Sequence, residues 1–458
     1  MTSPTIGAAG APAPAGAPAP VGAPTRPVRT PADDLLAHVD EVVVLRGWLH
    51  RQRRLAAVSF LVLRDASGLA QVVVREPSLA AGLGSLVEES VLEVRGRVVA
   101  NPQAPGGAEL VDPEVTVLVA PAVAPPFDLY RPQVAASLPT RLDHAAVALR
   151  HPARQAVQRV AAAAVAGFRS TLDQRGFVEV HTPKIVASAT ESGANVFALD
   201  YFGRTAYLAQ SPQFYKQIMV GSLERVYEVG PVFRAEPHDT ARHLASYVSL
   251  DAELGFITDH RDVMAVLRDV VAGMLSMITD RVPTAVDLVG GLPTVPAEIP
   301  VLHFADALEM VGDATGTDLS AEPDLAPAHE RWLGEWARRE HGSDFVLVTG
   351  YPMAKRPFYT HPEPARPAYS NSFDLLFRGL ELVTGGQRLH RYEDYLAALA
   401  RTGQPVEPYE GYLEAFEFGM PPHGGFAIGL ERFVARLTGA ANVREVTLFP
   451  RDLHRLAP

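Results

Sequence analysis

The sequence of 458 residues contains no cysteine. Disulfide bonds, thiol nucleophiles and zinc sites built on cysteine are therefore excluded. The 15 histidines form no His-x-x-x-His pair, so a transition-metal site on one helix face is not expected. A chain without cysteine suits a reducing compartment, and we expect the protein in the cytoplasm.

Long apolar runs are missing as well. No run approaches the roughly 18 apolar residues that cross a bilayer, so no membrane partner is expected. The opening segment is almost all Ala, Pro, Gly, Thr and Val, without the basic start and apolar core of a secretory signal. Because such a segment cannot bury enough surface to fold, we expect residues 1–34 to be a disordered tail.

Positive charge is in the minority, with 41 basic against 52 acidic residues and a formal net charge of −11. A protein that binds nucleic acid through bulk charge alone would be basic. Any contact with nucleic acid must therefore come from local basic patches.

Residues 35–121 have the pattern of a small β domain. Five short β-branched runs, separated by Gly, Pro, Asp and Ser, predict a five-stranded closed barrel such as the OB-fold. Arginines and aromatic residues mix in one acid-free stretch of it: Arg46, Arg51, Arg53, Arg54 and Arg64, with Trp48 and Phe60. Such a mixture holds single-stranded nucleic acid, but a solvated basic face with two core aromatics fits these residues equally well.

A Pro-rich and then polar segment, 122–145, is predicted to be a hinge, and residues 146–458 to form a second domain. After a helical pattern that ends at Gly176, strand-like runs follow one another directly. This order favours an antiparallel sheet flanked by helices, so the predicted fold class is α+β. The run "FVEVHTPKIV" is predicted to be a strand at an edge or interface, because Pro183 interrupts it.

The loop "FRAEPHDTARH", residues 233–243, concentrates charge between two strand-like runs. Arg234 and Glu236 lie on one face of the entering strand because strand side chains alternate, and Arg242 and His243 stand at the far end. Guanidinium groups are the usual bidentate partners of phosphate. The set predicts phosphate binding, although an ion-paired surface hairpin would use the same residues.

Two later segments carry related signals. In "PPHGGFAIGLERF", glycines let the backbone approach a ligand, and Arg432 falls in the first turn of a predicted helix. A tight packing turn would also use these glycines. Asp374 and Glu381 are carboxylates that, near phosphates, are expected to hold Mg²⁺, and Arg388 after a Gly-Gly pair can reach into a pocket.

Several segments together resemble the class II aminoacyl-tRNA synthetases. "FVEVHTP", the charged loop and "GGFAIGLER" look like motifs 1, 2 and 3 of that class. "LAQSPQFYKQ", "VGPVFRAE", "TARHL", "RPFYT", "MPPHGGF" and "TLFPRD" are similar to signatures of its aspartyl branch, of the archaeal and eukaryotic kind. The resemblance covers about residues 38–458. It implies an OB-fold barrel followed by a class II catalytic domain.

The resemblance implies a role for each matching residue in ATP binding. Arg234 and Arg432 would be catalytic, with Arg234 on the α-phosphate and Arg432 on the outer phosphates. Glu236 would contact the adenine. The full set implied for ATP is Arg234, Glu236, Arg242, His243, Glu381, Gly429 and Arg432, and the set implied for Mg²⁺ is Asp374, Glu381 and Thr384.

The resemblance also implies an L-aspartate site. Lys216 and Arg388 would pair with the side-chain carboxylate, and a site with two such cations favours an anion. The substrate ammonium would be surrounded by Glu191, Ser211, Gln213 and Asp251. In the barrel, the implied anticodon contacts are Arg46, Trp48, Phe60 and Gln71.

The implied partners are ATP, L-aspartate, tRNA(Asp) and a second copy of the chain, joined through the motif 1 strand. Whether tRNA(Asn) is also charged stays open. The sequence departs from the pattern of the family at three places: Ser246, the pair Ala56 and Ala57, and Ser192. They leave open a specialised paralogue: an inhibitor-resistant duplicate, an asparagine-forming ligase that does not charge tRNA, or a non-catalytic RNA-binding protein.

Overall fold

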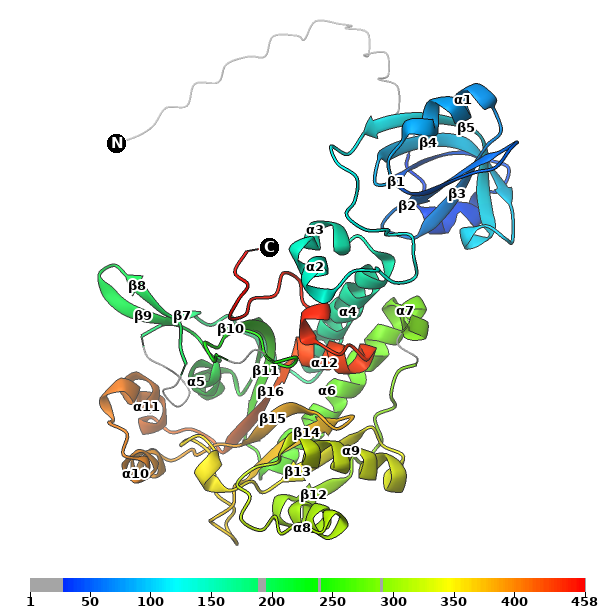
Figure 1. Cartoon of the computed structure of the whole chain (residues 1–458). Coiled ribbons are helices and arrows are strands. Elements are labelled where there is room, and N and C mark those ends of the chain that lie inside the picture. Colours follow the sequence, from blue (N-terminus) through cyan, green and yellow to red (C-terminus); the bar gives the residue numbers. More distant parts are fainter. Residues whose placement is uncertain (1–27, 188–194, 238–239, 289–290, 458) are drawn as a thin grey trace, which may run out of the picture. The chain divides into compact units, whose positions relative to one another are not determined.

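The computed structural model describes residues 28–187, 195–237, 240–288 and 291–457 (Figure 1). The chain divides into two compact units, Met1–Arg131 and Pro132–Pro458. The division falls inside the segment predicted to be a hinge. Among the described residues, no helix is long and apolar enough to cross a membrane.

The first unit is a closed five-stranded barrel with the strand order β1-β2-β3-β5-β4. Its strands are β1 (Val42–Arg54), β2 (Ser59–Arg64), β3 (Leu69–Val74), β4 (Val91–Ala100) and β5 (Ala108–Val119), with a short helix α1 (Pro77–Gly82). Alternate residues of all five strands fill the interior, which is the pattern that the β-branched runs predict. The barrel is therefore confirmed.

The end of the predicted tail is ordered on this barrel. Arg29 pairs with Asp65 at 2.8 Å, and a 3-10 helix, η1 (Ala32–His38), begins before residue 35. The Asp65 carboxylate also accepts a hydrogen bond from the backbone N–H of Ala32 at 3.1 Å. Residues 1–27 of the predicted tail lie outside the described residues.

The second unit is built on an eight-stranded sheet. In spatial order its strands are β12 (Val301–His303), β13 (Phe345–Thr349), β14 (Ser372–Phe377), β15 (Glu381–Gln387), β16 (His423–Gly429), β11 (Ser246–Gly255), β10 (Arg225–Phe233) and β6 (Val178–Glu179). Neighbours are antiparallel except for the pairs β12–β13 and β10–β6. The expected mainly antiparallel sheet is confirmed.

The segment around Pro183 is not one strand. It forms β6 in the large sheet and β7 (Ile185–Val186) in a separate sheet with β9 (Arg204–Leu208) and β8 (Ala198–Tyr201). Proline lacks an N–H and restricts the residue before it, so the ladder stops there. The Glu228 carboxylate instead accepts hydrogen bonds from Thr182 N at 3.0 Å and Thr182 Oγ1 at 2.7 Å.

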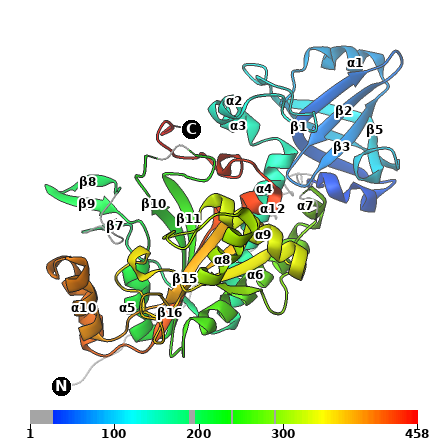
Figure 2. The ribbon, with the colours of Figure 1, turned by 60° about the horizontal axis from the view of Figure 1, so that its bottom comes forward.

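One face of the large sheet carries the main apolar core. Helices α4 (Pro152–Gln174), α6 (His260–Arg281) and α12 (Leu430–Thr438) pack there, and the even-numbered residues Leu250, Ala252 and Leu254 of β11 point into that core. Strands β10, β11, β16 and β15 lie side by side in Figure 2. The odd-numbered residues of β11 must face the other way, because strand side chains alternate.

On that second face, apolar clusters cover only the two ends of the sheet. Helices α8 (Phe304–Thr315) and α9 (Pro327–His341) pack on β13 and β14. Helices α5 (Gln213–Leu223), α10 (Tyr392–Thr402) and α11 (Glu410–Glu417) gather near β10. The strip between the clusters, over β11, β16 and β15, is left to polar side chains. The short helices α2 (Leu138–Asp143), α3 (Ala145–Ala148) and α7 (Pro283–Leu288) complete the unit.

Candidate active site

A pocket of about 360 Å³ lies on the polar strip. The loop after β10, strands β11 and β15, and the junction of β16 with α12 all contribute to its lining. Eight residues singled out from the sequence line it: Arg234, Glu236, Arg242, His243, Glu381, Thr384, Gly429 and Arg432. Residues far apart in the chain therefore meet in one pocket.

Two arginines of this pocket, Arg242 and Arg432, form only long ion pairs. Arg432 Nη1 lies 3.6 Å from Glu381 Oε1, and Arg242 Nη1 lies 3.8 Å from a carboxylate oxygen of Glu330. The Arg234 guanidinium carbon lies 5.5 Å from the centre of the Tyr247 ring, which the sequence reasoning did not name. Long, part-exposed ion pairs are weak, so the guanidinium groups of Arg242 and Arg432 can turn to a bound anion at little cost.

Helix α12 begins at the pocket wall. Gly429 is its N-cap and provides no side-chain cap, so the first backbone N–H groups of the helix remain as anion donors. Glu431 in the first turn accepts hydrogen bonds from Val248 N at 3.1 Å to both oxygens. Burial raises the pKa of Glu431 to about 7. This acid, which precedes Arg432 in the predicted first helical turn, ties α12 to β11.

Three oxygen-bearing side chains lie together on β14 and β15. Asp374 and Thr384 are directly opposite each other across the two strands, and Thr384 Oγ1 donates to Glu381 Oε1 at 3.4 Å. Asp374 is buried outside the pocket lining, and Arg356 Nη2 lies 3.0 Å from each of its oxygens. Burial raises the pKa of Asp374 to about 6, although Arg356 opposes that shift.

This oxygen set is suitable for Mg²⁺. Glu381 and Thr384 line the arginine-bearing pocket, so an ion there would share protein oxygens with substrate phosphates and water, as Mg²⁺ prefers. The set contains two carboxylates and one hydroxyl. Within the described residues, no group of three or more His, Asp or Glu side chains is placed to hold a metal ion.

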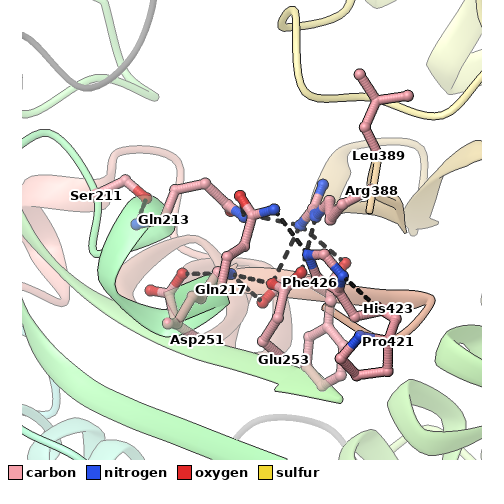
Figure 3. A network of polar contacts seen from close by, with 12 residues as sticks. Ser211, Gln213, Gln217, Asp251, Glu253, Arg388, Leu389, Pro421, His423 and Phe426 are labelled. Carbon is pink, nitrogen blue, oxygen red and sulfur yellow. Dashed lines mark hydrogen bonds and ion pairs between the residues drawn. The ribbon is translucent and has the colours of Figure 1, made fainter. Parts of the chain in front are cut away.

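Next to the pocket, four buried charged side chains form a second cluster (Figure 3). Lys216 Nζ lies 3.0 Å from Asp251 Oδ1 and 3.3 Å from Glu253 Oε2. Arg388 Nε donates to Glu253 Oε1 at 3.0 Å. Two cations thus face two carboxylates in a nearly dry environment, where each charge needs its partner.

Glu253 is the central residue that the sequence reasoning missed. Burial alone would raise the pKa of Glu253, but Arg388 and Lys216 together lower it. Tyr247, Ser249, Asp251 and Glu253 alternate along β11 on the polar face, so the two-residue period from Asp251 was a usable signal. Ser249 Oγ donates to Asp251 Oδ2 at 2.5 Å and also lines the pocket, which joins the two clusters.

The remaining residues predicted to bind aspartate lie at the start of α5. Ser211 Oγ accepts a hydrogen bond from Gln213 N at 3.1 Å, and the Gln213 side chain is buried beside Arg388. Glu191 lies outside the described residues. The cluster therefore includes all the described residues predicted for aspartate: Ser211, Gln213, Lys216, Asp251 and Arg388.

The barrel has a pocket of its own, of about 310 Å³, lined by Arg53, Leu55, Phe60, Gln71, Asn101 and Gln103. Arg53 Nη2 donates to Gln71 Oε1 at 3.2 Å, and its guanidinium lies 5.6 Å from the centre of the Phe60 ring. Arg46 and Trp48 do not line this pocket, and Arg46 pairs with Glu93 at 2.6 Å. Arg64 is buried in an ion pair with Glu89 at 2.9 Å, so it does not belong to a solvent-facing basic patch.

Comparison with family models identifies both units. Residues 137–453 match the model described as tRNA synthetases class II (D, K and N). Residues 43–118 match the model described as an OB-fold nucleic acid binding domain.

Similar proteins extend along nearly the whole chain. The aspartate–tRNA(Asp/Asn) ligase of Thermus thermophilus is 48% identical, over 93% of this chain and 99% of the relative. The aspartate–tRNA(Asp/Asn) ligase of Deinococcus radiodurans is 45% identical, over 94% of this chain and 99% of the relative.

Solved structures of both aspartyl and asparaginyl enzymes are similar. The aspartyl-tRNA synthetase of Entamoeba histolytica matches with a TM-score of 0.85 and 29% identity, covering 95% of this chain and 94% of that one. The asparaginyl-tRNA synthetase of Pyrococcus horikoshii, complexed with asparaginyl-adenylate, also has a TM-score of 0.85, with 31% identity over 92% and 97% of the two chains. The fold alone therefore does not separate the two amino acids.

Proposed function

The chain belongs to the class II tRNA synthetases of the D, K and N family, and on that premise we propose that it is an aspartate–tRNA ligase. It activates L-aspartate with ATP and transfers the aspartyl group to the 3′ end of tRNA(Asp). The observation that carries the choice of amino acid is the pair of buried cations, Lys216 and Arg388, beside the ATP-sized pocket. The names of the relatives agree with this choice.

Activation needs positioning and charge stabilisation, without a general base. The α-carboxylate of aspartate is already ionised, and one of its oxygens attacks the α-phosphorus of ATP while the bond to pyrophosphate breaks. Arg234 stabilises the charge that grows on the α-phosphate, and Arg242, His243 and Arg432 hold the outer phosphates. A ribose hydroxyl of the tRNA then attacks the aspartyl carbonyl, and AMP leaves.

Mg²⁺ would be held by Glu381 and Thr384, with Asp374 behind them. When bound, the ion neutralises phosphate charge. Glu381 Oε1 also lies 3.6 Å from Arg432 Nη1, so this carboxylate and this guanidinium are neighbours in the phosphate site.

Selection of aspartate over asparagine rests on Arg388. Its Nε and Nη2 are bonded to Glu253, Gln213 and the Gly425 carbonyl, whereas its Nη1 has no hydrogen-bond partner among the described residues. Nη1 is therefore available to the substrate side chain. A substrate carboxylate would accept a charge-assisted hydrogen bond from Nη1, which is stronger than the neutral-acceptor bond that an asparagine amide could make there.

The barrel is proposed to read the anticodon through the Arg53, Phe60 and Gln71 pocket, by ring stacking and hydrogen bonding. We further propose that the protein works in the cytoplasm as a homodimer, joined near the edge strand β6 and Pro183. Val178 and Ile185 are partly exposed there, as an interface on motif 1 would require.

Charging of two tRNA transcripts with labelled aspartate tests the proposal, one transcript carrying the anticodon GUC and the other GUU. We expect both to accept aspartate, as the relatives named Asp/Asn ligases do. Charging of the GUC transcript alone would establish a discriminating enzyme.

The same assay separates the alternatives. Aspartate-dependent ATP–pyrophosphate exchange without charging of either transcript would contradict tRNA ligation and favour an asparagine-forming ligase. Absence of both activities would favour a non-catalytic paralogue and overturn the proposal.

A further inference from the structure

Behind the proposed aspartate site lies a buried chain of hydrogen bonds from His423 to Arg388, by way of Gln217 and Gln213 (Figure 3). His423 and Gln217 are fully buried, on β16 and α5. Neither contacts the pocket that holds ATP. The direction of each hydrogen bond in this chain can be worked out from its fixed end.

The fixed end is the backbone carbonyl of Pro421. His423 Nδ1 lies 2.9 Å from this oxygen, which can only accept, so Nδ1 carries the proton. Burial lowers the pKa of His423 to about 4, although Glu253 opposes that shift, so the ring is neutral near pH 7. His423 Nε2 is then an acceptor, and the atom 2.9 Å from it, Gln217 Nε2, must be a donor.

This contact sets the orientation of the Gln217 amide. Its second N–H donates to Tyr395 Oη at 3.1 Å. Its oxygen accepts from Gln213 Nε2 at 2.9 Å and from Tyr412 Oη at 3.0 Å. A flipped amide would place its NH₂ against the Gln213 NH₂ and leave His423 Nε2 facing an oxygen, which is costly in a buried site.

The orientation of the Gln217 amide in turn determines the orientation of the Gln213 amide. Because its NH₂ is used by Gln217, its oxygen faces Arg388 Nη2 at 3.4 Å. The Gly425 carbonyl accepts from the same Nη2 at 3.2 Å, and Glu253 holds Nε. One edge of the guanidinium is thus occupied, which leaves Nη1 for the substrate. A reversed Gln213 would set an NH₂ against the cation.

We propose that His423 is a positioning residue, which acts through Gln217 and Gln213 to orient the Arg388 guanidinium toward the side chain of aspartate. The inference rests on the proposed function, because it needs Arg388 to bind the amino acid. Nothing in the comparisons assigns a role to His423 or Gln217.

The test is a pair of substitutions of similar size, of which only one carries an amide oxygen that can accept a hydrogen bond. His423→Gln can place Oε1 near the position of Nε2, whereas His423→Met has a similar size and no comparable acceptor. Both are assayed by aspartate-dependent ATP–pyrophosphate exchange. For His423→Met we expect the KM for aspartate to rise about tenfold, as loss of an oriented hydrogen bond to a charged group predicts. The KM for ATP should stay within about twofold, and His423→Gln should restore most of the aspartate affinity.

The outcomes distinguish this inference from the proposed function. If the unaltered protein shows no aspartate-dependent exchange, the proposed function fails. If it is active and His423→Met keeps the same KM for aspartate, or raises both KM values equally, the positioning role is wrong.

Should His423→Met not fold, Gln217→Met supplies the measurement, because it removes the acceptor that orients Gln213. It is expected to raise the KM for aspartate selectively. An unchanged KM in that variant would overturn the inference.

Discussion

At the amino-acid end of the site, four buried side chains carry two positive and two negative charges. Arg388→Leu removes one cation and leaves Lys216 as the ion-pair partner of Glu253 among the described residues. We expect aspartate-dependent exchange to fall by about a hundredfold, since truncating one partner of a buried, hydrogen-bonded charge pair costs about 2–5 kcal/mol of binding, with ATP binding retained. Exchange kinetics and ATP titration measure the two effects.

Arg391→Leu is the matched control, because Arg391 is exposed and its ion pair with the exposed Glu393 is long, at 3.9 Å, and therefore weak. It should leave the KM for aspartate unchanged. Unchanged aspartate affinity in Arg388→Leu itself would refute the role of Arg388.

Glu431 predicts a pH dependence of stability. Its pKa is raised from 4.5 to about 7 by burial, so the folded state binds this proton more tightly than the unfolded state does. Stability therefore falls as the pH rises from about 4.5 to 7, by on the order of 3 kcal/mol from this group. Glu431→Gln should remove that penalty and become more stable relative to the unaltered protein at pH 8 than at pH 5.

Thermal unfolding midpoints of the two proteins across pH 5–8 give this comparison. A difference between the midpoints that does not change with pH would show that Glu431 does not titrate in this range.

Among the elements, strand β16 lies between the phosphate pocket and the aspartate site. It has glycine at position 425, where there is no room for a side chain. A Cβ at Gly425 would meet the Glu253 carboxylate and the Ala252 carbonyl. The strand cannot move away, since it pairs with β11 on one side and β15 on the other. Gly425→Ala should displace Glu253, cost about 1–3 kcal/mol of stability and weaken aspartate binding.

Gly411→Ala is the control for this substitution. Gly411 lies in α11, nothing stands within 4 Å of its added Cβ, and alanine favours a helix. Chemical denaturation and exchange kinetics of both variants measure the difference. Wild-type aspartate affinity in Gly425→Ala would contradict the packing argument.

On the scale of the molecule, the proposed function assigns tRNA reading to the barrel and amino-acid activation to the second unit. Arg53→Ala should reduce tRNA charging about tenfold while leaving ATP–pyrophosphate exchange unchanged, since Arg53 lies in the barrel pocket with Phe60 and Gln71. Arg95→Ala is the control, because Arg95 is exposed on β4 and its ion pair with the exposed Glu114 is long, at 3.7 Å, and therefore weak. Steady-state charging of the GUC transcript measures both. Equal effects of the two substitutions would show that the pocket does not bind the anticodon.

Much of the fold could be read from local patterns. The alternation of apolar residues predicts the barrel strands and the succession of strands in the second unit, because side-chain period follows secondary structure. The break at Pro183 was predicted as an edge, but its division between two sheets was not. Which sheet a two-residue strand joins depends on partners such as Glu228, far along the chain.

For the site, the sequence by itself determined the residue types that the proposed function uses: guanidinium groups for phosphates, oxygens for Mg²⁺ and two cations for a carboxylate. Only the tertiary structure decided which of them meet. Glu253 was not named from the sequence, and His423 was given no role within "MPPHGGF". The contacts of both residues depend on β11, β16 and α5 being held together, where burial makes each unpaired charge or hydrogen bond costly. The sequence determines which functional groups each segment carries, whereas contacts between residues that are distant in the chain form only when the sheet folds.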